Sequence, residues 1–307
     1  MAGTTDAAIE VIGLVKTFGT LRAVDGLDFS VGRGQVHGFL GPNGAGKSTT
    51  IRVLLGLYRA SSGRVSVLGK NPWSAAAEVT RQISYVPGDV SLWPNLTGQE
   101  VLDALAGLRG AYDIATERAL VDAFALDPRR KVGTYSTGNR QKVLLVAAFA
   151  ARTKLMILDE PTSGLDPLMQ GVFQQAVRAA AAHGRTVLLS SHLLDEVDKL
   201  CGAVTIIKDG RLVETGQLAQ MRHLAAARVT AAVPNGSVQS VESEIAGARI
   251  EGLVGGVAAG GRVDLRVPSE GVARVLGILA RADAGQIVCA PATLDDLFLR
   301  HYAVAAR

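Results

Sequence analysis

The segment Gly41–Thr49 has the sequence GPNGAGKST and matches the pattern G-x-x-x-x-G-K-[ST] at every fixed position. It follows an apolar segment, Val36–Leu40, and precedes a helical pattern, Thr50–Leu57. That order of strand, loop and helix is the context in which such a loop binds phosphate. Glycines let the backbone turn tightly and direct its N–H groups at an anion, and the next helix adds the partial positive charge of its N-terminus. The sequence therefore predicts a phosphate-binding loop between a strand and a helix.

Side chains of the same loop supply the groups that a nucleoside triphosphate with Mg²⁺ requires. Lys47 can reach the outer phosphates as a point charge, and the hydroxyl of Ser48 can bind the metal ion. A chance match to this pattern is roughly a one-in-a-hundred event on background residue frequencies, so a glycine-rich turn without a ligand is a weak alternative. The predicted nucleotide-binding residues of the loop are Gly41, Pro42, Asn43, Gly44, Ala45, Gly46, Lys47, Ser48 and Thr49.

A second segment, Lys154–Pro167, has the sequence KLMILDEPTSGLDP and places two carboxylates after an apolar run. The run Leu155–Leu158 ends at Asp159 and Glu160. Such a run predicts a fully buried strand that delivers both acids to the C-terminal edge of a parallel sheet. Nucleotide and metal chemistry is usual at that edge, where one acid can hold a metal ion while its neighbour acts on a water.

The composition describes a globular chain with room for more than one domain. It has 307 residues, of which 48% are hydrophobic and 20% charged, and its net charge of +4 does not require a nucleic-acid ligand. Cys201 and Cys289 are far apart and lack metal-ligand spacing, so we expect free thiols in a reducing compartment. We expect no signal peptide and no bilayer-spanning segment, since no apolar run approaches the ~18–20 residues needed. A role at a membrane would then require another polypeptide.

The order of these motifs resembles that of the ATP-binding subunit of an ABC transporter, over about residues 9–217. The segment Tyr135–Gln141, YSTGNRQ, stands where this family has its signature, L-S-G-G-Q, at the start of a helix. Ser136 and Gly138 match the signature, and the neighbouring positions depart from its commonest form. The resemblance implies an α/β fold of the P-loop NTPase class with a helical subdomain at about 89–150, and ATP and Mg²⁺ as cofactors. It also implies that Ser136 and Gly138 close over the ATP of a second subunit.

The resemblance assigns catalytic roles to three polar residues at predicted strand ends. Asp159 is implied to hold Mg²⁺ together with Ser48, and Glu160 to be the general base that polarises the attacking water. The strand Thr186–Ser191 is expected beside the strand of the phosphate loop, and His192 follows it. His192 is implied to contact the γ-phosphate and to orient the water.

Two further residues are assigned to the nucleotide by resemblance. Asp166 is the key residue of the SGLD loop that crosses the dimer interface in the family. Phe18 stands where the family has an aromatic residue that stacks on adenine, an interaction worth on the order of 1–3 kcal/mol. A position in the hydrophobic core is the alternative for Phe18.

The sequence departs from the family after the predicted strand Ile83–Val86. Gly88 occupies the place of a glutamine that usually follows Y-V-P, and it has no side chain that could ligate Mg²⁺. We hypothesise that the next residue, Asp89, takes part of the metal role, directly or through a water. The alternative is that Asp89 only caps the turn that follows.

This departure and the neighbouring segment Leu92–Glu100, LWPNLTGQE, are similar to bacterial drug and antibiotic exporters of the daunorubicin-resistance or tetronasin-export type. The resemblance implies an ATPase that powers export of a drug, antibiotic or lipid-like compound through an integral membrane permease. Its partners would be that permease and a second copy of the chain in a head-to-tail dimer, with no nucleic acid. It would lie at the cytoplasmic face of the membrane.

The predicted helical subdomain contains helical patterns at Gln99–Leu108 and Thr116–Ala125. In the family, its junction with the main sheet receives a helix of the membrane subunit. Leu92 and Trp93 are candidate contacts there. The alternative is that Trp93 belongs to the subdomain's own core.

Residues 221–307 are expected to form a separate, small α+β domain after an ATPase domain at 1–220. The apolar patterns predict strands at Arg228–Val233, Arg249–Val254, residues 263–267 and Gln286–Cys289, and helices at residues 238–245, 272–279 and Leu294–Tyr302 with Thr293 as its N-cap. The order β-α-β-β-α-β suggests a ferredoxin-like unit. We hypothesise that it steadies or regulates the dimer.

Two other functions compete with transport. A soluble ABC ATPase that acts on nucleic acid would carry long coiled coils between the motifs, but here only about 110 residues without a heptad run separate the loop from the acidic strand. A nucleotide-dependent regulator without turnover would need neither Glu160 nor His192. The sequence favours an ATP-hydrolysing enzyme.

Overall fold

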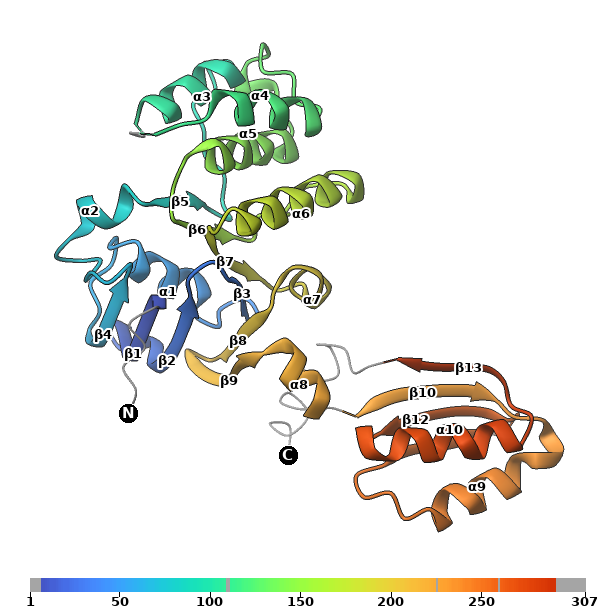
Figure 1. Cartoon of the computed structure of the whole chain (residues 1–307). Coiled ribbons are helices and arrows are strands. Elements are labelled where there is room, and N and C mark those ends of the chain that lie inside the picture. Colours follow the sequence, from blue (N-terminus) through green and yellow to red (C-terminus); the bar gives the residue numbers. More distant parts are fainter. Residues whose placement is uncertain (1–6, 109–110, 225, 259, 291–307) are drawn as a thin grey trace. The chain divides into compact units, whose positions relative to one another are not determined.

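The computed structural model describes residues 7–108, 111–224, 226–258 and 260–290, and the chain forms two compact units (Figure 1). The first unit ends at Gly216 and the second begins at Gln217. No helix among the described residues is long and apolar enough to cross a membrane.

The first unit combines two β-sheets with helices that pack on them. Its strands are β1 (Ala7–Phe18), β2 (Leu21–Gly32), β3 (Val36–Leu40), β4 (Ser62–Val67), β5 (Ile83–Val86), β6 (Leu155–Asp159), β7 (Thr186–Ser191), β8 (Ala203–Lys208) and β9 (Arg211–Gln217). Its helices are α1 (Lys47–Leu54), α2 (Ala76–Thr80), α3 (Gly98–Gly107), α4 (Ile114–Ala123), α5 (Thr137–Ala150), α6 (Pro167–Ala182) and α7 (Leu194–Leu200), with a 3₁₀ turn at Val132–Thr134.

The larger sheet has the strand order β5-β6-β7-β3-β8-β9, and the contacts from β5 to β8 are parallel. Every residue of β6 and β7 is buried, as expected for strands covered on both faces. The register pairs Leu40 with Ser191 and Asp159 with Ser190, so β3, β6 and β7 end at the same edge. This confirms that the strand before His192 lies beside the strand of the phosphate loop.

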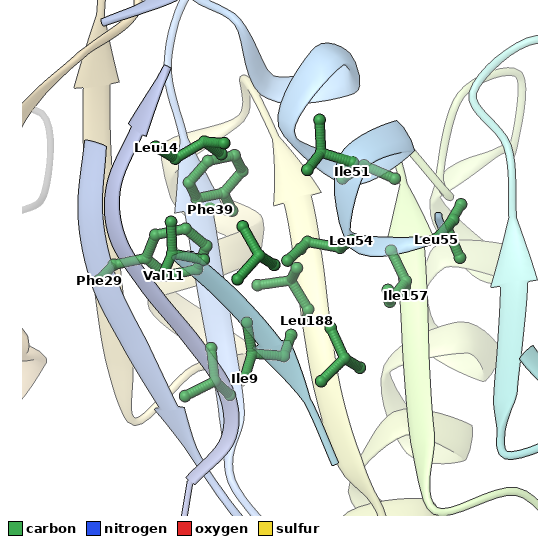
Figure 2. Packing of buried hydrophobic residues seen from close by; sticks show 14 of the residues in the cluster. Ile9, Val11, Leu14, Phe29, Phe39, Ile51, Leu54, Leu55, Ile157 and Leu188 are labelled. Atoms are coloured by element: carbon green, nitrogen blue, oxygen red, sulfur yellow. The ribbon is translucent and has the colours of Figure 1, made fainter. Parts of the chain in front are cut away.

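The core of the first unit lies between the larger sheet and an antiparallel sheet of order β2-β1-β4 (Figure 2). Phe29 of β2 stacks on Phe39 of β3, with ring centroids 5.1 Å apart. Each large apolar side chain that is fully buried contributes about 1.5–3 kcal/mol. The side chains labelled in Figure 2 come from both sheets and from α1 with its C-cap: Ile9, Val11, Leu14, Phe29, Phe39, Ile51, Leu54, Leu55, Ile157 and Leu188.

The helices α3, α4 and α5 follow β5 and precede β6, where the helical subdomain was predicted (Figure 1). A capping box starts α3: Thr97 accepts from the backbone N–H of Glu100, and the Glu100 carboxylate accepts from that of Thr97. The hydrogen bonds that the Thr97 N–H and hydroxyl donate to the Glu100 carboxylate lower the pKa of that carboxyl. Trp93 is 53% exposed, so the alternative that places it in the subdomain core is wrong.

Polar groups hold both ends of helix α5. It begins at Thr137, because the hydroxyl of Ser136 accepts from the N–H of Asn139 and caps it. At its other end, the Arg185 guanidinium donates to the carbonyl oxygens of Ala148 at 3.0 Å and Phe149 at 2.8 Å. Burial lowers the pKa of Arg185 to about 10. The charge lies where the carbonyls of a helix C-terminus favour a cation.

The second unit contains α8 (Leu218–Leu224) and then a four-stranded antiparallel sheet of order β11-β12-β10-β13. Its remaining elements are β10 (Ala227–Ala232), α9 (Val238–Gly247), β11 (Val254–Ala258), β12 (Arg262–Val267), α10 (Val272–Arg281) and β13 (Gly285–Ala290), with 3₁₀ turns at Asn235–Ser237 and Ser269–Gly271. The order from β10 to β13 is β-α-β-β-α-β, and α9 and α10 pack together on the sheet.

One strand prediction in the second unit is wrong. The strand expected at Arg249–Val254 begins only at Val254 and extends to Ala258. Arg249 has a left-handed φ of 46°, which ends α9 in a turn, and Ile250 and Leu253 pack against the core from that turn. The predicted helix at Leu294–Tyr302 and its cap Thr293 lie outside the described residues.

Candidate functional site

The phosphate loop folds over the N-terminus of α1. Helix α1 begins at Lys47, earlier than the apolar pattern predicts, and Gly46 caps it with a left-handed φ of 101°. A Cβ at Gly46 would lie 2.7 Å from the carbonyl oxygen of Ala23, so only glycine fits this position. The N–H groups of the first helical turn therefore face the loop as an anion site.

Lys47 is buried against the loop that it serves. Its Nζ donates to the carbonyl oxygens of Gly41 at 2.6 Å and Pro42 at 3.3 Å, and it lies 3.4 Å from Oε1 of Glu160. The ammonium thus already has oxygen partners at the position where an outer phosphate would bind. Phosphate oxygens can replace these partners without leaving the charge unpaired.

The loop borders a cavity of about 520 Å³, within the usual range for small-molecule sites. Most of the residues around it are ones that the sequence predicts to bind a nucleotide. The sequence did not indicate part of the rim: Leu21, Arg22, Ala23 and Asp209. The lining residues are these four together with Pro42, Asn43, Gly44, Gly46, Lys47, Ser48, Thr49 and Glu160.

Asp209 reaches the cavity because the turn between β8 and β9 is attached to the phosphate loop. The N–H of Gly210 donates to the carbonyl of Ala45 at 3.1 Å, and the N–H of Asp25 donates to the carbonyl of Gly210 at 2.8 Å. An Asp-Gly pair between apolar runs predicts a hairpin turn. Nothing in the local sequence indicates that this turn packs on a loop about 165 residues earlier.

Glu160 and His192 form a contact pair at the ends of β6 and β7. Nδ1 of His192 lies 2.5 Å from Oε2 of Glu160. Glu160 has a left-handed φ of 49°, a conformation that costs a non-glycine residue of order 1–3 kcal/mol, and its N–H donates to the carbonyl of Ser190 at 2.9 Å. Backbone strain of this kind concentrates at functional sites, and here it places the carboxylate between Lys47 and His192.

Asp159 has the character of a metal ligand. It is only 4% exposed, and its Oδ1 has no hydrogen-bond partner among the described residues. A buried unpaired carboxylate oxygen is costly unless a ligand satisfies it. No cluster of three His, Cys, Asp or Glu side chains occurs in the described part of the chain. This donor set fits Mg²⁺, which binds through one or two protein oxygens together with substrate phosphates and waters.

Gly88 lies against the carboxylate pair. A Cβ at this position would be 3.2 Å from the carbonyl oxygen of Asp159 and 3.5 Å from Cβ of Glu160. A longer side chain on this segment could therefore approach the metal position. Asp89 is exposed beside it.

Asp89→Ala is expected to weaken the apparent affinity for Mg²⁺ in ATPase assays if Asp89 contributes to the metal shell. The Mg²⁺ concentration for half-maximal activity would rise. The value for Asp89→Asn would lie between those of Asp89→Ala and the wild type. Titration of ATPase activity with Mg²⁺ measures this effect. An unchanged titration in Asp89→Ala would leave Asp89 only the role of a turn cap.

The other residues assigned by resemblance lie outside this cavity. Ser136 and Asp166 are exposed and cap α5 and α6, and Asp166 accepts from the N–H of Met169 at 3.0 Å. Gly138 packs against Gly164 of the SGLD loop. The ring of Phe18 is 41% exposed and meets Tyr58 edge-on at 5.3 Å, so Phe18 is not a core residue.

The geometry assembles the groups for hydrolysis of a nucleoside triphosphate at one sheet edge. The loop and Lys47 offer donors for phosphate, Asp159 and Ser48 offer oxygens for a metal ion, and Glu160 offers a base. The signature and SGLD segments form a separate exposed surface of the same unit.

Comparison with known proteins agrees with this geometry. Residues 24–163 match the family model described as "ABC transporter". Over 220 residues the chain is 43% identical to the daunorubicin/doxorubicin resistance ATP-binding protein DrrA of Streptomyces peucetius, covering 70% of this chain and 67% of that protein. It is 34% identical over 209 residues to the bacitracin transport ATP-binding protein BcrA of Bacillus licheniformis, covering 67% of this chain and 68% of that protein.

Solved structures show the same fold. The structure of an ATP-binding subunit of an ABC transporter superimposes with a TM-score of 0.66 at 32% identity, covering 70% of this chain and 92% of the other. A dimeric bacterial ABC transporter cassette superimposes with a TM-score of 0.62 at 22% identity, covering 68% of this chain and 98% of the other. Together with the phosphate loop and the carboxylate pair, these similarities show that the chain belongs to the ABC transporter family and contains its ATP-hydrolysing, ATP-binding domain.

Proposed function

We propose that this chain powers the export of a drug or antibiotic through a separate membrane permease, from the cytoplasmic face of the membrane. This proposal rests mainly on the 43% identity, over 220 residues, to a daunorubicin/doxorubicin resistance ATP-binding protein. The bacitracin transport protein among its relatives supports export of an antibiotic class of substrate.

We also propose that two copies form the working enzyme. In one copy, the capped N-terminus of α5 at Ser136 is exposed, and it lies outside the cavity bordered by Lys47. A helix N-terminus that faces solvent offers its free N–H groups to an anion. In a head-to-tail dimer, Ser136 and Gly138 of one copy would close over the phosphates held by the other, and Asp166 would lie at the interface. ATP then favours the closed dimer because it contacts both surfaces only there.

Within each site, the chain's own residues divide the work of hydrolysis. Lys47 and the loop N–H groups bind the phosphates and hold them in line. Glu160 accepts the proton of the attacking water, and His192 orients Glu160 through its Nδ1 contact of 2.5 Å. Mg²⁺, held by Ser48 and Asp159, would supply charge neutralisation for the leaving phosphate.

The permease contact is proposed at the segment before α3. Trp93 is an exposed aromatic side chain of the first unit, and aromatic residues are enriched at protein interfaces. Leu92 is half-buried beside it.

Trp93→Ala is expected to release the chain from its permease and to leave ATP hydrolysis by the free chain unchanged. The chain is co-expressed with a candidate permease, and co-purification and drug resistance of the cells are measured. Trp73→Ala, which removes another half-exposed tryptophan of the same unit, is the matched control. Retained co-purification of the Trp93→Ala variant would remove Trp93 from the contact, and absence of drug resistance with the wild-type pair would contradict export.

For the second unit we propose a role in steadying or regulating the dimer. It has its own apolar core, formed by residues such as Val229, Leu265 and Leu279, and it is divided from the ATPase domain at Gly216. Removal of residues 217–307 is therefore expected to leave a folded ATPase domain with a weaker ATP-dependent dimer. Light scattering with ATP and steady-state ATPase measurements test this. If the truncated chain dimerises and hydrolyses ATP as the full chain does, the unit has neither role.

A further inference from the structure

Glu196 carries a buried carboxyl group near Glu160 and His192. The hydrolysis proposed above gives this carboxyl group no role. Glu196 lies on α7 and is only 7% exposed. Neither carboxyl oxygen makes a hydrogen bond of good geometry within the described residues. An ionised carboxylate buried in this way is costly, because no water or cation replaces its hydration.

The surroundings of Glu196 come from the ends of the two catalytic strands. The hydroxyls of Thr162 and Ser191 lie close enough to lower its pKa, although they do not reach ideal hydrogen-bond geometry. Thr162 is two residues after Glu160, and Ser191 directly precedes His192. Glu196 therefore lies between the backbone segments that carry the catalytic base and its partner.

The charges that face Glu196 favour its neutral form. Burial is the largest effect and raises its pKa, and the charge of Glu160 raises it further, while His192 lowers it. Glu196 also acts on Cys201, a buried thiol near the end of α7. Burial raises the pKa of that thiol most, and the charges of Glu196 and Asp198 raise it further. None of these neighbours is a fixed cation that could hold Glu196 as a carboxylate.

We propose that Glu196 is a positioning residue for ATP hydrolysis that acts as a neutral acid, fixing the segments of Thr162 and Ser191 and so the separation of Glu160 and His192. The protonated carboxyl can donate its O–H to one of the two hydroxyls and accept from the other. An ionised carboxylate could only accept, and it would add a second negative charge beside Glu160. The inference rests on the proposed role of Glu160 as the base.

This role gives a defined direction with pH. Because the pKa of Glu196 is raised in the folded protein, the neutral form and its positioning effect are complete at low pH. They are lost as the pH rises through that folded-state pKa. Activity of the wild type should therefore decline on the alkaline side as Glu196 ionises.

The test compares Glu196→Gln, Glu196→Ala and the wild type in steady-state ATPase assays of the full chain, from about pH 6 to about pH 9.5. Glutamine imitates the neutral acid, so Glu196→Gln should keep wild-type activity at neutral pH and lack the alkaline decline that Glu196 causes. Glu196→Ala should lose about tenfold to 10²-fold in kcat at neutral pH with little change in KM, as expected for a misplaced base. Asp195→Asn, a change to an exposed carboxylate on the same helix, is the matched control and should behave as the wild type.

Three results would overturn the inference: wild-type kcat in Glu196→Ala, equal losses in Glu196→Gln and Glu196→Ala, or an alkaline decline unchanged in Glu196→Gln. Thermal unfolding of each variant separates loss of positioning from loss of fold. Glu160→Gln in the same assay tests the base itself. Activity retained by Glu160→Gln would contradict the proposed function, whereas a failure of Glu196 alone would leave that function intact.

Discussion

Glu160→Gln is expected to lower ATP turnover by about 10²–10⁴-fold, the usual contribution of a positioned general base. Glutamine keeps the shape of the side chain and its contact distance to His192, but it cannot accept the proton of the attacking water. Lys47, which lies 3.4 Å from the carboxylate, loses a competing anion and remains available to phosphate. Binding of ATP should therefore persist or strengthen, and the closed dimer should accumulate.

Three measurements check this result: phosphate release, equilibrium binding of ATP, and the mass of the ATP-bound species by light scattering. Lys47→Ala serves as the contrast, because it should lose binding as well as turnover. A Glu160→Gln variant that hydrolyses ATP at the wild-type rate would show that another group acts as the base.

Gly138→Ala is expected to impair both stability and turnover, although alanine normally favours a helix over glycine by about 1 kcal/mol. A Cβ at Gly138 would lie 2.3 Å from the carbonyl oxygen of Gly164, a separation that neither backbone can accept without moving. Crowding of this kind costs about 1–3 kcal/mol. It would also displace the start of α5 from the SGLD loop, and a displacement of about 1 Å at a catalytic surface can reduce turnover by about 10²-fold.

Gly171→Ala is the matched control for this substitution. Gly171 lies within α6, and a Cβ there meets nothing within 4 Å, so alanine should stabilise the protein slightly and leave turnover unchanged. Thermal unfolding and steady-state ATPase assays of both variants check that Gly138→Ala lowers stability and turnover while Gly171→Ala does not. Equal stability of the two variants would mean that α5 and the SGLD loop can separate freely.

The sequence was sufficient to predict the strands that position the catalytic residues, because each strand is marked by an apolar run in its own segment. β3 and β5 have the bounds that their apolar runs predict, and β6 adds only Asp159 to its predicted run. The common edge at which β3, β6 and β7 end could also be predicted, because parallel strands covered on both faces end at the same edge of a sheet. The positions of Lys47, Glu160 and His192 are consequences of where β3, β6 and β7 end.

The errors arose where distant contacts decide the structure. Ile250 and Leu253 have the apolar character of a strand, but they fill the core of the second unit from a turn. Gly255 lies inside β11, where its missing side chain lets it approach the backbone of Asp264 in the neighbouring strand β12. The cavity rim at Arg22 and Asp209 was missed for the same reason, because its two segments meet only in the folded chain.

The attachment of the β8–β9 turn to the phosphate loop has a consequence for how this enzyme can diverge. The two hydrogen bonds at Gly210 join main-chain atoms, and Gly210 itself is held by close approach to the backbone of Ala23. The phosphate cradle is therefore insensitive to most substitutions around it. Leu21, Arg22 and Asp209 line the same cavity with side chains that make none of these bonds. Exchanging them can therefore change the wall of the cavity while the main-chain bonds that hold the phosphate loop stay the same.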